Sequence, residues 1–222
     1  MGFFKRASRL RKILLIFATL FLLLLGFIAY KVFWDPENTK QVFYPLSQED
    51  RGLLRHGDII LRKGYGMFSD GIIEVQNSPN PVSHCAMILD EDKQWKVVHA
   101  LSSSVAQFDG VQRQNLQRFL NESVPGSIIV VRYKSSSDTI AAIASRAAYY
   151  ADAKKPFDHN FDNEDTTAYY CTELFQKAFY QVLKRDIFHA QMRENNTGIY
   201  DLSTFQDTSL FEVVLNHQNR KN

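Results

Sequence analysis

The pattern of apolar and polar positions begins with one long stretch that carries no charge. Residues 13–30 are apolar or small except for Thr19, and Val32, Phe33 and Trp34 extend the apolar character beyond Lys31. At about 1.5 Å per residue these 18 positions reach about 27 Å as a helix, close to the hydrocarbon thickness of a bilayer. The pattern predicts a transmembrane helix over residues 13–34.

Basic residues precede this stretch, and no acidic residue does. They are Lys5, Arg6, Arg9, Arg11 and Lys12. Positive flanks stay on the cytoplasmic side of a membrane, so residues 1–12 should be cytoplasmic. We expect a single-pass signal anchor in the inner (cytoplasmic) membrane, with the rest of the chain on the periplasmic side. A cleaved secretory signal is the alternative, although no A-x-A-like site precedes Lys31 and no cysteine follows to carry a lipid anchor.

Beyond the span, short apolar strands alternate with helical stripes. The pattern predicts strands over residues 59–62, 83–89, 95–101 and 126–133, the middle two forming a hairpin around the polar residues 90–93. It predicts helices over residues 67–77, 115–120, 139–153 and 172–183. Asp138 is the expected cap of the third helix, and Pro156 lies beyond its end.

These elements predict an α+β fold, in which a small antiparallel sheet is packed by helices. We expect residues 35–54 to form a linker, residues 55–215 one domain and residues 216–222 a polar tail. The length of 222 residues and the hydrophobic content of 45% suffice for one packed domain plus an appendage.

Charge excludes one class of partner. The first 30 residues hold five of the 26 basic residues and no acidic one, so the rest of the chain, with 21 basic and 24 acidic residues, has a net charge of −3. A nucleic-acid-binding domain shows a basic surplus instead. We therefore expect no nucleic-acid partner.

The strongest candidate for chemistry is Cys171, which follows an aromatic pair at the start of a predicted helix. The positive end of a helix dipole favours the thiolate form of a cysteine. Two histidines on predicted strands, His84 and His99, could act as a general base and as the group that orients it. Tyr170 is a further candidate donor for an oxyanion. The combination indicates a cysteine hydrolase that works by acyl transfer, without a cofactor.

The second cysteine has a structural interpretation. Side chains alternate along a strand, so Cys85 should face away from the site if His84 faces it. We expect Cys85 to be a small buried filler. Two cysteines are too few for a disulfide scaffold, although they could still bridge each other.

Two non-hydrolytic interpretations use the same residues. His84, His99 and Cys171 could be three zinc ligands, but they lack a paired spacing motif. The domain could also be a membrane-anchored binding module without activity. Glu173, early in the predicted helix, is expected to cap that helix rather than to act in catalysis.

Several short motifs in order resemble a known family. They are Gly57-Asp58-Ile59-Ile60, Ser83-His84-x-x-Met87, a hydrophobic strand ending before Ala100, Lys155-Pro156-Phe157-Asp158 and Tyr170-Cys171-Thr172-Glu173-Leu174. This order resembles the YiiX/YebB-type cysteine hydrolases, the circularly permuted papain-like branch of the NlpC superfamily, which is related to lecithin:retinol acyltransferases. The resemblance covers roughly residues 55–215.

The resemblance implies a permuted papain-like fold with Cys171 as nucleophile and His84 as general base. The third polar position of this branch is commonly a Glu before an Ala, whereas this chain has His99 there, as in the acyltransferase relatives. The NlpC side of the resemblance implies an amidase or peptidase acting on cell-wall-type peptides. The acyltransferase side implies a lipid acyl hydrolase or acyltransferase, and the sequence leaves both open.

Overall fold

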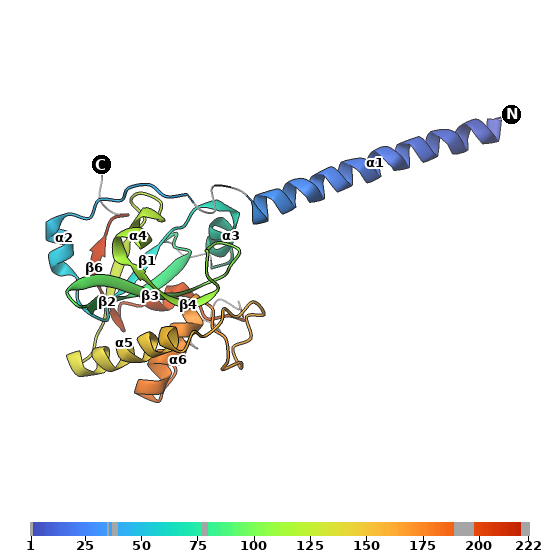
Figure 1. Ribbon diagram of the computed structural model, residues 1–222. Helices are drawn as coiled ribbons and strands as arrows, with labels where there is room; N and C mark the ends of the chain where they lie inside the picture. The colour runs from blue at the N-terminus through green and yellow to red at the C-terminus, as the bar shows by residue number, and fades with distance from the viewer. Residues whose placement is uncertain (1, 35, 37–39, 77–79, 189–197, 219–222) are drawn as a thin grey trace. The chain divides into compact units, whose positions relative to one another are not determined.

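The computed structural model describes residues 2–34, 36, 40–76, 80–188 and 198–218 (Figure 1). The chain divides into two compact units, Met1–Pro36 and Glu37–Asn222. The first unit contains helix α1 (Gly2–Phe33). Its segment Arg11–Lys31, with a mean hydropathy of 2.8, is long and apolar enough to cross a membrane. By length and composition it qualifies as a membrane anchor or as a signal sequence.

The second unit is built on one antiparallel sheet of six strands. Their order across the sheet is β4-β3-β2-β1-β5-β6. The strands are β1 (Ile59–Arg62), β2 (His84–Glu91), β3 (Gln94–Leu101), β4 (Gly110–Asn115), β5 (Ile129–Tyr133) and β6 (Phe211–Asn216). The predicted α+β class with an antiparallel sheet is confirmed.

Helices cover both faces of the sheet. They are α2 (Gln48–Leu53), α3 (Gly66–Gln76), α4 (Leu116–Asn121), α5 (Ser137–Asp152), α6 (Cys171–Leu183) and the 3₁₀ helix η2 (Leu202–Gln206). Helices α5 and α6 lie side by side on one face, and α4 lies on the other (Figure 1). The helix predicted over residues 172–183 is α6, and Cys171 is its first residue.

Alternation along β2 divides the core into two clusters. Cys85, Met87 and Leu89 belong to the cluster that α5 and α6 cover. Ala86 and Ile88 belong to the cluster on the opposite face, with residues of α4 such as Phe119. Successive strand residues point to opposite faces. The face on which a candidate residue of β2 lies therefore decides which other candidate residues it can contact.

The folded unit begins earlier than the predicted linker allows. Tyr44, Leu46 and Asp50 are buried against it, so the linker over residues 35–54 was drawn too long. Strands β4 and β6 were not predicted: the sequence of β4 is mostly polar, and the apolar run of β6, which is Val213, Val214 and Leu215, is short. Ser136, not Asp138, caps α5 by accepting a hydrogen bond from the Thr139 amide. Residues 77–79 and 219–222, the predicted helix end and most of the tail, lie outside the described residues.

A buried ion pair fixes the turn that leads into β1. Asp58 is fully buried and accepts two hydrogen bonds from the Arg132 guanidinium, at 2.7 and 2.9 Å. It also accepts a hydrogen bond from the Arg55 amide at 2.8 Å. Burial raises the pKa of Asp58, with Arg132 opposing that effect. The pair therefore ties the start of β1 to its neighbour β5.

Replacing Arg132 with Gln should lower the free energy of unfolding by about 3–5 kcal/mol, because it leaves a buried carboxylate without its partner. The loss should shrink as the pH is lowered, since the unpaired Asp58 can then be protonated. Urea unfolding at two pH values measures both effects. An exposed-site control, Arg146→Gln, should change little, and equal effects of the two variants would contradict the assignment.

Candidate functional site

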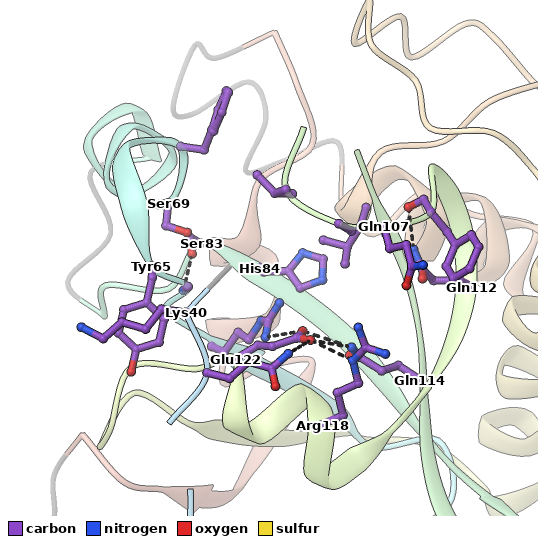
Figure 2. Close-up of a pocket in the computed structure, with 18 of the residues that line it drawn as sticks. Lys40, Tyr65, Ser69, Ser83, His84, Gln107, Gln112, Gln114, Arg118 and Glu122 are labelled. Carbon is purple, nitrogen blue, oxygen red and sulfur yellow. Dashed lines mark hydrogen bonds and ion pairs between the residues drawn. The ribbon is translucent and has the colours of Figure 1, made fainter. Parts of the chain in front are cut away.

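His84 stands at the first position of β2, at the edge of a pocket. In the sheet register it lies opposite Arg62 of β1. Its side chain is only 7% exposed and lines a pocket of about 460 Å³. Figure 2 shows the imidazole in the middle of this pocket, with Arg118 and Glu122 below it. The start of β2 thus delivers an imidazole to a cavity, as a base or a hydrogen-bonding group requires.

His84 is held by the second predicted histidine. Its Nε2 lies 2.9 Å from Nδ1 of the fully buried His99. Both rings pack on the ring of Phe119, at centroid distances of 5.9 and 5.6 Å. The predicted contact between the two histidines is confirmed. His99 Nε2 is buried without a hydrogen-bond partner among the described residues, so among these residues the ring of His99 is hydrogen-bonded to His84 alone.

Burial keeps both imidazoles neutral. It lowers the pKa of His84 well below its usual value, with the charges of Arg62 and His99 adding to the effect. It lowers the pKa of His99 to about 3, with Arg62 and Arg118 contributing. A neutral imidazole keeps a lone pair that can accept a proton, but its lowered pKa makes it a weaker base.

Cys171 lies at the start of α6 and packs against the helix-covered cluster. The pKa of its thiol is lowered, first by a hydrogen bond from the Cys85 thiol. Burial opposes this, and hydrogen bonds from the Thr172 amide and from its own amide support it. The Thr172 hydroxyl donates its proton to the Tyr200 carbonyl at 2.7 Å. The pKa of Cys85 is raised well above its usual value by burial and by the same contact. Both cysteines are free. The local structure therefore favours a thiolate at Cys171.

His84 and Cys85 point to opposite faces as predicted, but the expectation that His84 would be the one to face Cys171 is wrong, because Cys85 contacts it instead. Alternation along β2 places Cys85 on the α6 face and the ring of His84 on the Phe119 face. Both residues are described, yet the structure contains no hydrogen bond between the Cys171 sulfur and either histidine. Cys171 is also not among the residues that line the described pocket. The structure thus joins the candidates as two pairs, His84 with His99 and Cys171 with Cys85.

Two neighbours of Cys171 have structural partners. The Tyr170 hydroxyl donates to Asn163 Oδ1 at 2.6 Å and accepts from the Tyr200 amide at 2.7 Å. Its only O–H is therefore engaged, and the geometry gives no support to its expected role as an oxyanion donor. Glu173 accepts a hydrogen bond from the Tyr170 amide at 3.3 Å, which is the expected helix-capping contact.

The pocket contains charged residues that the sequence did not single out. Arg62 is 6% exposed, lies 4.3 Å from the centre of the Phe119 ring and donates to the Phe119 carbonyl at 2.9 Å. Glu122 accepts from Arg118 at 3.1 Å and pairs with Arg62 at 3.5 Å. An arginine that ends the apolar strand 59–62 was the one signal in the sequence that could have drawn attention to this group.

The proposed zinc ligands are not assembled. Within the described ranges, no group of three or more His, Cys, Asp or Glu side chains is placed to hold a metal ion. His84, His99 and Cys171 are divided between the two faces of β2, so they do not form a three-ligand set in this structure.

Comparison with known proteins gives a family and a fold. Residues 53–213 match the family described as permuted papain-like amidase enzymes, YaeF/YiiX, the C92 peptidase family. The chain is similar to a crystal structure of the metalloprotein YiiX from Escherichia coli O157:H7, with a TM-score of 0.59 and 19% sequence identity. The similarity covers 73% of this chain and 97% of that one. A search of curated proteins found no match.

The hydrogen bond between the two thiols predicts a pH effect. Replacing Cys85 with Ala removes the donor that stabilises the Cys171 thiolate, so the pKa of Cys171 should rise. Alkylation of Cys171 by iodoacetamide should then need a higher pH to reach half of its maximal rate. Rates measured from pH 5 to 10 by mass spectrometry give the midpoint. Cys85→Ser, which keeps a donor, should fall between the two, and an unchanged midpoint in Cys85→Ala would refute the assigned contact.

Proposed function

The chain belongs to the family of permuted papain-like amidases, and on that premise we propose that it is a cysteine amidase that cleaves peptide-type amides through a thioester. The observation that carries this proposal is Cys171, a thiol of lowered pKa at the first position of α6. A thiolate is the nucleophilic form of cysteine. Exposed backbone N–H groups in the first turn of a helix also attract an oxyanion.

In the proposed reaction His84 accepts the proton of the Cys171 thiol, and the thiolate attacks the amide carbon to form a tetrahedral oxyanion. Collapse of this intermediate breaks the C–N bond, and His84 returns the proton to the leaving nitrogen as the amine departs. Water then attacks the thioester and releases the acid and the thiol. Amide N–H groups at the start of α6 stabilise the oxyanion in both steps.

His84 is the proposed proton acceptor. When its Nε2 donates to His99 Nδ1, its own Nδ1 keeps a lone pair that can accept a proton. His99 then acts as a positioning residue. We propose that His84 and Cys171, which lie on opposite faces of β2 in this structure, come together when substrate binds.

Cys171→Ala should abolish hydrolysis, because no other group at the start of α6 can form the thioester. His84→Ala should lower kcat/KM by about 10²–10⁴-fold, the range for loss of a general base. Hydrolysis of cell-wall peptide fragments and of phospholipids, followed by mass spectrometry, measures both effects. The exposed-site variant Arg146→Gln serves as the control.

Wild-type rates in Cys171→Ala would exclude the cysteine mechanism. A different outcome would identify a lipid acyl hydrolase. In that case the wild type would cleave phospholipids but not peptides, and Cys171→Ala would lose the phospholipid cleavage.

We further propose that α1 remains in the mature protein as a single-pass anchor, with the amidase unit outside the cytoplasmic membrane. This proposal is supported by the apolar segment Arg11–Lys31 and by the basic residues before it. It would place the enzyme beside extracytoplasmic peptides and lipid headgroups.

A C-terminal alkaline phosphatase fusion tests this topology, because that reporter is active only after export. We expect activity in the membrane fraction and a fusion of uncleaved mass. An inactive fusion would indicate the opposite orientation, with the amidase unit in the cytoplasm. An active, shortened and soluble fusion would show that α1 is a cleaved signal.

A further inference from the structure

The pocket beside His84 has an excess of positive charge on one side. Arg62 and Arg118 line it with one carboxylate, Glu122. A further lining cation, Arg113, is engaged by Glu91 and Asp152, at 2.9 and 3.1 Å. The local charge is therefore unbalanced, and the pocket favours a negatively charged ligand.

Arg62 supplies donors that the protein itself does not use. Its Nη1 makes both hydrogen bonds of the guanidinium, to the Phe119 carbonyl and to Glu122. Nε is buried without a hydrogen-bond partner in the described part of the chain. A buried donor without a partner is unfavourable, so a ligand oxygen that approached it would be bound strongly.

Glu122 holds the two arginines in place and has no capacity left for a ligand. Its carboxylate accepts hydrogen bonds from Arg118 and from Gln114, at 3.1 and 3.0 Å, and pairs with Arg62. The side chain of Arg118 is 55% exposed, and only its Nε is used in this contact. Two guanidinium groups are thus anchored by one acid, while their remaining N–H groups can bind an anion.

We infer that the pocket binds a carboxylate of the substrate through Arg62 and Arg118. This inference rests on the proposed function and names its substrate class, a peptide-type amide that carries a carboxylate. His84 lines the same pocket, so the bound carboxylate would lie beside the proposed proton acceptor. Guanidinium groups match the two oxygens of a carboxylate in a fork geometry.

The rest of the lining favours a peptide over an acyl chain. Side chains of Gln107, Gln112 and Gln114 reach the pocket (Figure 2), and their amide oxygens can accept hydrogen bonds from peptide N–H groups. Phe68, Ile72 and Phe108 provide an apolar wall for small side chains. A lipid chain would instead need a pocket that is apolar throughout.

Binding to the full chain in detergent micelles, with Cys171→Ala to prevent turnover, tests the inference. The probes are N-acetyl-L-alanyl-L-alanine and its C-terminal carboxamide, which differ only in charge at one end. We expect the carboxylate to bind about ten-fold more tightly, the usual scale for a charged hydrogen bond. Adding Arg118→Gln should remove most of that advantage, and adding Arg146→Gln should leave it intact.

Equal affinity for the two probes, no saturable binding of either, or an advantage unchanged by Arg118→Gln would overturn the inference. Tighter binding of a short-chain phosphatidic acid would overturn the choice of a carboxylate. The proposed function fails separately. Selective binding of the carboxylate without hydrolysis by the wild type would refute the amidase activity and support the carboxylate subsite. Hydrolysis without selective binding would support the amidase activity and refute the subsite.

Discussion

The alternation of side chains along β2 is the constraint on which the site depends. His84 and Cys85 are neighbours in sequence, and strand geometry sends them to opposite faces of the sheet. One face receives the imidazole, His99 and Phe119, and the other receives Cys85, Cys171 and helix α6. A shift of one residue in register would exchange these environments. The pairing of Arg62 with His84 and of Leu61 with Cys85 prevents that shift.

The two faces prepare their groups by different physical means. On the helix face, hydrogen bonds from Cys85 and from the first turn of α6 lower the pKa of Cys171 against the opposing effect of burial. On the pocket face, burial and the charge of Arg62 lower the pKa of His84. In a preformed thiolate–imidazolium pair each charge would stabilise the other. Here the thiolate is supported without the imidazole, and the imidazole stays neutral.

The sequence was sufficient to predict the elements with strong periodicity. The apolar run 13–30, the hairpin of β2 and β3, and helices α5 and α6 were all found, and so was the contact between His84 and His99. Strand β4 was missed because its sequence, Gly110–Asn115, is mostly polar and is a strand only through pairing with β3. The contact between Cys85 and Cys171 was not predicted. Alternation requires His84 and Cys85 to point to opposite faces of the sheet, but it does not determine which of the two faces α6.

The arginine cluster was beyond sequence reasoning for another reason. Arg62, Arg118 and Glu122 come from a strand and from a helix with its cap, and only the folded chain places their charges together. Their proximity also has a consequence for His84, since a cation that binds a carboxylate loses part of its effect on neighbouring groups. Burial is the main cause of the lowered pKa of His84, and the charge of Arg62 is the second. An anion bound at Arg62 would weaken only this second cause and make the imidazole a stronger base, so the proposed carboxylate site and the strength of the base would be linked through one guanidinium.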